Sequence, residues 1–125
     1  MIELRKVIKS ILLTYHARIY HQQASNAAQF PYVIFDFPTS FQNEQQEIFN
    51  LDVDIWDDNS EDTTELETLA SQLWKALNYY RYSDEKIQFS IYRENRLPPL
   101  DEKEPRLRRR KLIFSVRYYD KRLFE

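Results

Sequence analysis

Residues 47–57, with the sequence EIFNLDVDIWD, decide the fold because apolar and polar side chains alternate along them. The apolar set is Phe49, Leu51, Val53 and Ile55, and the other set is Asn50, Asp52, Asp54 and Trp56. Successive side chains of a strand point to opposite faces of the sheet. The pattern therefore predicts a strand with one face in the core and the other toward solvent.

A helix is predicted directly after this strand. Residues 57–62, DDNSED, have the composition of a turn and a helix start, and Ser60 or Asp62 is expected to accept first-turn backbone amides. Apolar residues then recur at helical spacing: Leu66, Leu69, Ala70, Leu73, Trp74 and Leu77. The helix is expected to end near Asn78.

The N-terminal part of the chain predicts a helix and two strands. An amphipathic helix is expected over residues 4–15, where apolar side chains again recur at helical spacing. A short strand is expected at residues 18–20, and a second at residues 32–37, which lie between Pro31 and Pro38. Residues 21–29 and 39–46 are expected to be loops.

The C-terminal part predicts two further strands, at residues 87–92 and over about a dozen residues near the end. The last strand has an inward set, Leu112, Phe114, Val116 and Tyr118. Residues 94–106, with three prolines, are expected to form a long connection. Together these elements predict an α+β fold: a two-layer sandwich with a mainly antiparallel sheet of about four strands and two helices packed on one face. At 125 residues the chain is expected to be a single domain, residues 1–125.

Composition excludes several classes of protein. The chain has no cysteine and no glycine. Without cysteine there is no disulfide or thiolate metal site. Without glycine the chain cannot form a Walker loop, a dinucleotide-binding turn or a nucleophile elbow, which need positive φ or close backbone approach to phosphate. Asn and Asp are expected to take any left-handed turns.

The sequence predicts no cofactor, no metal site and no membrane segment. His16 and His21 are the only histidines, and no nearby residues complete a ligand set. Charged residues interrupt the apolar runs, which are much shorter than the ~20 residues that span a bilayer. With 18 basic and 20 acidic residues the formal net charge is −2, so electrostatic capture of nucleic acid is not the default expectation.

Charge is segregated along the chain. Residues 51–67 contain eight carboxylates and no Lys or Arg, whereas residues 103–122 contain nine basic residues and two acidic ones. If the two strands concerned pair within one sheet, opposite charges neutralise each other across it. If they lie on different subunits, they form complementary patches that favour self-assembly. The sequence leaves both alternatives open.

Two other functions are weaker alternatives. The basic run Arg106, Arg108, Arg109, Arg110 and Lys111, followed by tyrosines, is a candidate nucleic-acid contact. Asp52 and Asp54, with Asp84 and Lys86, loosely match the carboxylate and lysine set of metal-dependent nucleases. No catalytic triad can be assembled, so we expect the protein not to be an enzyme.

Three stretches of the chain resemble the tail terminator proteins of long-tailed bacteriophages and prophages, also called tail completion or head–tail joining proteins. They are residues 18–35, with a Pro-Tyr-led strand; residues 52–77, with the alternating strand, acidic turn and helix; and the closing strand at residues 112–119. The absence of glycine and the long 94–106 connection depart from the family pattern.

The resemblance implies a non-enzymatic structural protein that forms a ring, expected to be a hexamer. Such a ring caps the tail tube and joins it to the head connector, so the implied partners are further copies of the chain, the tail tube protein and the head completion (connector) protein. The implied location is the virion, at the head–tail junction, after synthesis in the host cytoplasm. Membrane is not an expected partner.

Two sets of residues are then expected at contacts. The subunit or partner interface is predicted to include Asp52, Asp54, Asp57, Asp58, Arg108, Arg109, Arg110, Lys111 and Arg117. The 94–106 connection, with Glu94, Arg96, Asp101 and Lys103, is the candidate contact with tube or connector. Charge reversal at Arg109 and Lys111 is expected to weaken assembly without unfolding the monomer.

Overall fold

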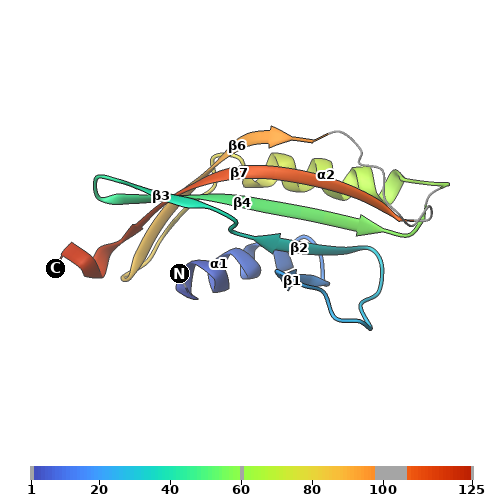
Figure 1. Ribbon diagram of the computed structural model, residues 1–125, viewed down its shortest axis with the longest axis horizontal. Helices are drawn as coiled ribbons and strands as arrows, with labels where there is room; N and C mark the ends of the chain where they lie inside the picture. The colour runs from blue at the N-terminus through green and yellow to red at the C-terminus, as the bar shows by residue number, and fades with distance from the viewer. Residues whose placement is uncertain (1, 60, 98–106, 125) are drawn as a thin grey trace.

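The computed structural model describes residues 2–59, 61–97 and 107–124, which form an α+β fold (Figure 1). Two α-helices lie in this part of the chain, α1 (Ile2–Leu13) and α2 (Thr64–Leu77). The strands are β1 (Ile19–His21), β2 (Tyr32–Asp36), β3 (Ser40–Asn43), β4 (Gln46–Asp57), β5 (Arg81–Ser83), β6 (Ile87–Arg96) and β7 (Arg108–Asp120). A short 3-10 helix, Lys121–Phe124, follows β7.

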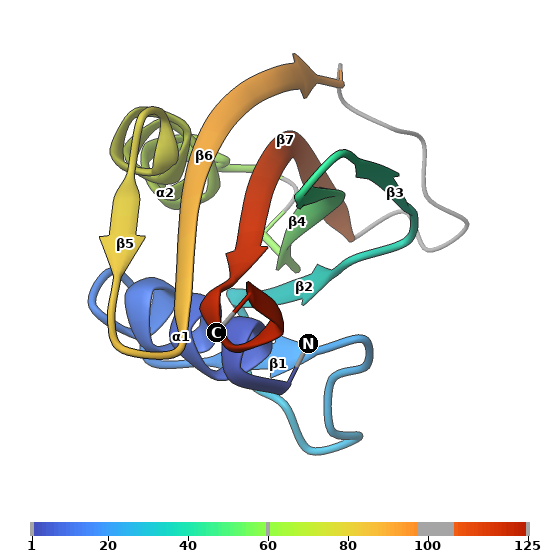
Figure 2. The same cartoon turned by 90° about the vertical axis from the view of Figure 1, so that its left-hand side faces the viewer.

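The strands form one sheet in the order β1-β2-β4-β7-β6-β5, with β3 paired to the first part of β4. β1 and β2 are parallel, and the other pairs are antiparallel. The sheet is strongly curled, and both helices lie on the same side of it (Figure 2). We call the opposite side the outer face of the sheet.

One hydrophobic core lies between the sheet and the helices. The apolar set of β4 is buried as predicted, and the inward set of β7 is buried beside it. Leu4, Ile8 and Leu12 of α1 and Leu66, Leu73 and Leu77 of α2 are fully buried in the same cluster. Chain connectivity also agrees with the prediction, because α2 carries the chain from β4 to the far side of β7.

In the described part of the chain the sheet has seven strands, more than the four or so predicted, so the strand count predicted from sequence is wrong. The predicted 39–46 loop contains β3, whose four residues are all exposed, so that no apolar alternation marks it. β5 has three residues directly after α2, too few for a pattern. Both strands form because a longer neighbour provides a hydrogen-bonding edge, which local sequence does not reveal.

β6 is longer than predicted and takes in the first part of the expected 94–106 connection. Glu94 and Arg96 belong to this strand, with a register shift between Arg93 and Asn95. Asp101 and Lys103 lie outside the described residues. The prediction of a connection is therefore wrong for residues 94–96, which belong to β6.

Left-handed backbone occurs at residues that the sequence did not predict. In the described part of the chain, Gln22, Glu44 and Tyr79 have φ of 66°, 56° and 64°. The expectation that Asn and Asp would take such positions is wrong for these three. Tyr79 directly follows Asn78, the C-cap residue of α2. Glycine is common at this position after a helix.

At the start of α2, Asp62 accepts a first-turn backbone amide as predicted, but the N-cap residue is Thr63, whose side chain makes no capping hydrogen bond. Asp62 Oδ1 accepts a hydrogen bond from the Thr64 backbone N–H at 2.9 Å. The other candidate, Ser60, lies outside the described residues. Glu65 and Glu67 in the first turn also suit the positive end of the helix dipole.

Candidate functional site

The acidic and basic strands pair within one sheet. β4 lies beside β7 with Asp54 opposite Lys111 and Trp56 opposite Arg109. Lys111 Nζ lies 3.2 Å from Asp52 Oδ2 and 3.5 Å from Asp54 Oδ2, and Arg109 Nη1 lies 4.0 Å from Asp54 Oδ1. Of the two arrangements that the sequence left open, these residues adopt cross-strand pairing in the chain itself.

This ion-pair network on the outer face is half-buried. The side chains of Asp52, Asp54 and Lys111 are 18%, 15% and 22% exposed. The Arg109 guanidinium lies over the Trp56 ring, 4.9 Å from its centroid. Because these charges are partly desolvated and lie beside charges of opposite sign, their first role is to hold β4 against β7.

Burial raises the pKa of the Asp54 carboxyl, and the positive charges of Lys111 and Arg109 only partly offset this rise. Its pKa in the folded state lies above that in the unfolded state. Its contribution to the free energy of unfolding is therefore complete at low pH, where the carboxyl is protonated in both states. That contribution is lost as pH rises through the raised pKa. The carboxyls of exposed Asp84 and half-buried Asp120 behave oppositely, because hydrogen bonds lower their pKa and their contribution to stability is lost as pH falls.

Asp54→Asn is therefore expected to make the loss of stability on acidification steeper than in the wild-type chain. The substitution removes the group whose contribution opposes that of Asp84 and Asp120. Urea unfolding between about pH 6 and pH 4 measures the effect. Asp58→Asn, which removes an exposed carboxylate outside the network, is the control. A flatter slope for Asp54→Asn would contradict the assignment.

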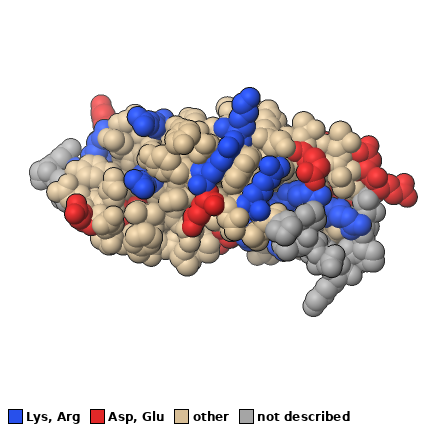
Figure 3. Space-filling view, turned by 90° about the horizontal axis from the view of Figure 1, so that it is seen from above, with Lys and Arg blue, Asp and Glu red and all other residues tan. Residues whose placement is uncertain are grey.

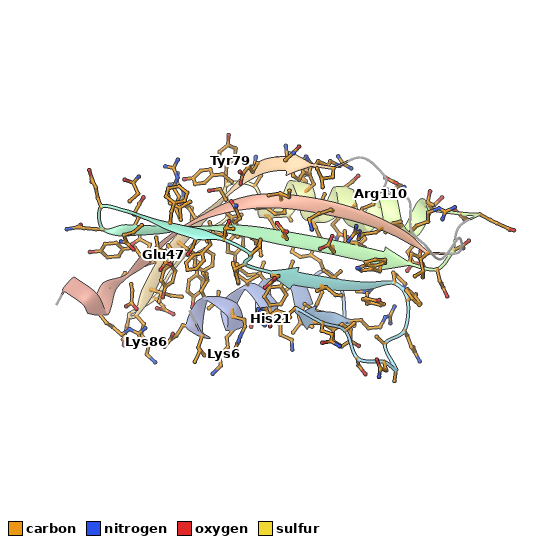
Figure 4. The ribbon with its side chains drawn as sticks, viewed as in Figure 1. Lys6, His21, Glu47, Tyr79, Lys86 and Arg110 are labelled. Atoms are coloured by element: carbon orange, nitrogen blue, oxygen red, sulfur yellow. The ribbon has the colours of Figure 1, made fainter. Side chains whose placement is uncertain are left out.

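The basic run is divided between the two faces of β7. Arg110 points toward α2, where its guanidinium binds the Glu67 carboxylate (Figure 4). Arg108 has the same parity as Arg110 and lies opposite Asp57, which is buried and accepts the Asp58 backbone N–H at 2.8 Å. Arg109 and Lys111 belong to the outer face, so the run does not present its charges together.

Arg117 differs from the other predicted interface cations. It is exposed on the outer face, and within the described residues no carboxylate pairs with it. Its guanidinium lies over the Tyr92 ring, 5.1 Å from the centroid. The ladder register places Ser90 opposite Arg117 and Arg81 opposite Ser90, so the three residues form a row across β7, β6 and β5. We call this the arginine row.

A shallow cavity of about 450 Å³ lies over the arginine row. Its lining includes Gln46, Gln88, Tyr92 and Tyr119 as well as the row itself. Of these residues, the interface predicted from sequence included only Arg117, and Tyr119 was named only as an aromatic side chain beyond the basic run. The stretch Tyr79-Tyr80-Arg81-Tyr82, directly after α2, is the signal that could have indicated the rest, because Tyr and Arg are enriched in protein interfaces.

Acidic side chains gather at the opposite end of the molecule, where β4 leads into α2 (Figure 3, right). Asp58, Glu61, Asp62 and Glu65 are exposed there. Within the described residues, no Lys or Arg forms an ion pair with them. We call these four residues the acidic end.

Two residues that the sequence analysis considered for a nuclease or metal site, Asp84 and His16, form hydrogen bonds within the fold. The Asp84 carboxylate accepts the backbone N–H groups of Lys86 and Ile87 at 2.7 and 2.8 Å and so forms the β5–β6 turn. His16 Nε2 donates to the Pro31 carbonyl at 2.7 Å. Across residues 2–59, 61–97 and 107–124, no cluster of three or more His, Asp and Glu side chains is placed to hold a metal ion.

The candidate partner contacts on β6 rest on α2. The Arg96 guanidinium lies 5.8 Å from the Trp74 ring centroid, and the Arg93 guanidinium lies 5.1 Å from it. Arg93 Nε also donates to the Trp74 carbonyl at 2.9 Å.

Neither described helix is long and apolar enough to cross a membrane.

Among solved structures, this arrangement of strands and helices is similar to that of a virion chain. The virion is that of a native gene transfer agent particle, and the TM-score is 0.66 over 88% of this chain and 85% of that chain. The fold of this chain is similar to that of the virion chain. At 12% sequence identity the similarity concerns the fold. No protein-family model matches the sequence, and no curated protein matches it either.

Proposed function

We propose that this chain is a structural, non-enzymatic component of a phage-like virion. The observation that carries the proposal is its likeness in fold, over 88% of the chain, to a chain of a gene transfer agent virion. The half-buried charges of β4 and β7 support it, since Asp52, Asp54 and Lys111 pair with one another and Arg110 pairs with Glu67, so that these groups contribute to the fold.

More specifically, we propose the role of a tail terminator: a ring, expected to be a hexamer, that caps the tail tube and binds the head completion protein at the head–tail junction. This assignment depends on the sequence resemblance of residues 18–35, 52–77 and 112–119. The separated acidic end and arginine row add support. A contact between unlike surfaces of identical copies gives a ring when the rotation between them closes.

The test is the absolute mass in solution, measured by light scattering behind a sizing column over a concentration series at low and moderate salt. A hexamer, or a monomer that assembles into one as concentration rises, is the expected result. A monomer at every concentration would contradict a self-assembling ring. Imaging the high-mass fraction then distinguishes a closed ring from an open chain.

Nucleic-acid binding is the second candidate, and the structure weighs against the segment first considered for it. Arg110 faces α2 and binds Glu67, whereas Arg109 and Lys111 lie on the outer face beside carboxylates. A strand that follows a phosphate backbone needs its cations on one face and free of acidic partners. Retardation of duplex DNA that weakens steeply with salt would favour this candidate instead.

A further inference from the structure

The arginine row has the geometry of a carboxylate-binding site. Arg81 and Arg117 flank Ser90 on neighbouring strands, which places their Cα atoms about 10 Å apart. Both arginines are exposed, and no carboxylate of the described chain pairs with either. A guanidinium binds a carboxylate through two parallel hydrogen bonds. The cavity over the row therefore fits acidic side chains that enter between the two arginines.

Two tyrosines extend the row into a larger contact surface. Tyr92, which lies under the Arg117 guanidinium, packs edge-to-face against Tyr79 with 5.8 Å between ring centroids. The Tyr79 side chain is 68% exposed and projects away from the sheet (Figure 4). Exposed Tyr and Arg side chains that hold one another in place are typical of the few residues that dominate binding energy at interfaces.

The backbone at Tyr79 is costly for this residue type. Its φ of 64° is in the left-handed region, which favours glycine and disfavours a residue with a bulky side chain. An exposed aromatic side chain at such a position makes few contacts that would compensate for the strain. This observation indicates a role for the ring outside the fold of the isolated chain.

The acidic end supplies the complementary group, and it cannot reach the arginine row of its own chain. Asp57 lies opposite Arg108 on β7, and Arg117 is nine residues further along the same strand. At about 3.3 Å per residue, the two ends are about 30 Å apart along the sheet. The two surfaces can therefore meet only between molecules.

We propose that the arginine row and Tyr79 bind the acidic end of a neighbouring copy of this chain. This inference rests on the proposed function and names the contact that would build its ring. The contact joins unlike surfaces head to tail, so each copy offers one arginine row and one acidic end. It differs from the sequence-based interface in that Lys111, Asp52 and Asp54 are used within the chain.

A charge-swap experiment tests the contact. One variant, Arg81→Glu with Arg117→Glu, reverses the row. A second, Asp58→Arg with Glu61→Arg and Glu65→Arg, reverses the acidic end, because three basic side chains then outweigh Asp62. Asp62 is left unchanged because its carboxylate accepts the Thr64 backbone N–H at the start of α2. Each variant alone is expected to lose the high-mass species seen for wild type in light scattering at low salt. An equimolar mixture is expected to recover it, because every contact in an alternating ring is then attractive.

The outcomes separate the inference from the proposed function. Wild type and both variants assembling equally would overturn this contact and leave the ring standing. Variants that lose assembly without recovery in the mixture would also overturn the pairing. A wild-type monomer at every concentration would contradict both. Retardation of duplex DNA that is lost in the Arg81→Glu, Arg117→Glu variant, without self-association, would overturn the contact in favour of phosphate binding.

Substituting Tyr79 provides a second test with two readouts of opposite sign. Tyr79→Gly removes the ring and relieves the backbone, so it is expected to raise the urea midpoint of unfolding while it weakens association about tenfold or more. Glu44→Gly is the matched control, since Glu44 is also exposed with positive φ, in the β3–β4 turn.

The Glu44→Gly control is expected to raise the midpoint and leave association unchanged. If the Tyr79→Gly variant associates as strongly as wild type, the Tyr79 side chain has no role in the contact. Both measurements use the full chain, so a change in folding is seen directly and is not mistaken for a change in binding.

Discussion

Lys111→Glu is expected to lower the free energy of unfolding by about 3–5 kcal/mol. The new carboxylate would lie beside Asp52 and Asp54, whose oxygens now lie 3.2 and 3.5 Å from Lys111 Nζ. Three carboxylates would then share a half-buried patch between β4 and β7. Of the two cations in the ion-pair network, only Arg109 would remain. Urea unfolding followed by tryptophan fluorescence measures the loss.

Arg117→Glu is the matched control for this prediction. It makes the same kind of change on the same face of β7, but Arg117 is exposed and has no carboxylate partner among the described residues. Its stability is expected to stay within about 0.5 kcal/mol of wild type. Equal urea midpoints for the two variants would contradict the role of the ion-pair network in stability.

This expectation revises the sequence-based one for charge reversal at Arg109 and Lys111. From sequence, such a change was expected to weaken assembly and leave the monomer folded. With Lys111 placed between two carboxylates, loss of assembly in that variant would follow from loss of the fold. Arg117 and Arg81 are therefore the positions at which charge reversal reports on contacts between copies.

Phe114→Ala is expected to destabilise the chain by about 3–5 kcal/mol. Phe114 is fully buried on β7, and its ring lies 5.4 Å from that of Trp74 on α2. Truncation would leave a cavity where the helix packs on the centre of the sheet, and a centrally placed cavity collapses poorly. Thermal and urea unfolding both measure the effect, and assembly is expected to be lost at temperatures where the variant unfolds.

Phe41→Ala controls for the loss of a phenyl ring as such. Phe41 lies on β3 and is 61% exposed, so its truncation is expected to change stability by no more than about 0.5 kcal/mol. Comparable destabilisation by the two substitutions would mean that the core does not lie between α2 and β7.

The elements that sequence predicts well are those with a long apolar pattern. β4 and the inward set of β7 alternate over many residues, and α2 repeats leucine at helical spacing. Such patterns indicate which face of the element is buried, and the burial of that face stabilises the element. β3 and β5 show no such apolar pattern, because backbone hydrogen bonds to β4 and β6 hold them in the sheet.

The candidate site could be predicted only in part, because register determines it. Sequence shows that Asp52 and Lys111 are charged and face outward, but two interpretations remained until β4 was found beside β7. The arginine row depends on two ladders at once, since Arg81 and Arg117 meet only through Ser90. Tyr79 was missed because nothing local predicts a tyrosine in left-handed backbone after a helix.

The outermost strands of the sheet, β1 and β5, have three residues each. Past the end of β5, the Asn78 side-chain oxygen accepts the Arg93 backbone N–H at 3.0 Å and so occupies a donor that a further strand would need. Long unpaired edges are templates for fusion of sheets into fibres. With edges this short, copies of the chain are left to meet through side chains of defined shape and charge. Growth of one sheet into the next by strand addition is therefore disfavoured in this fold.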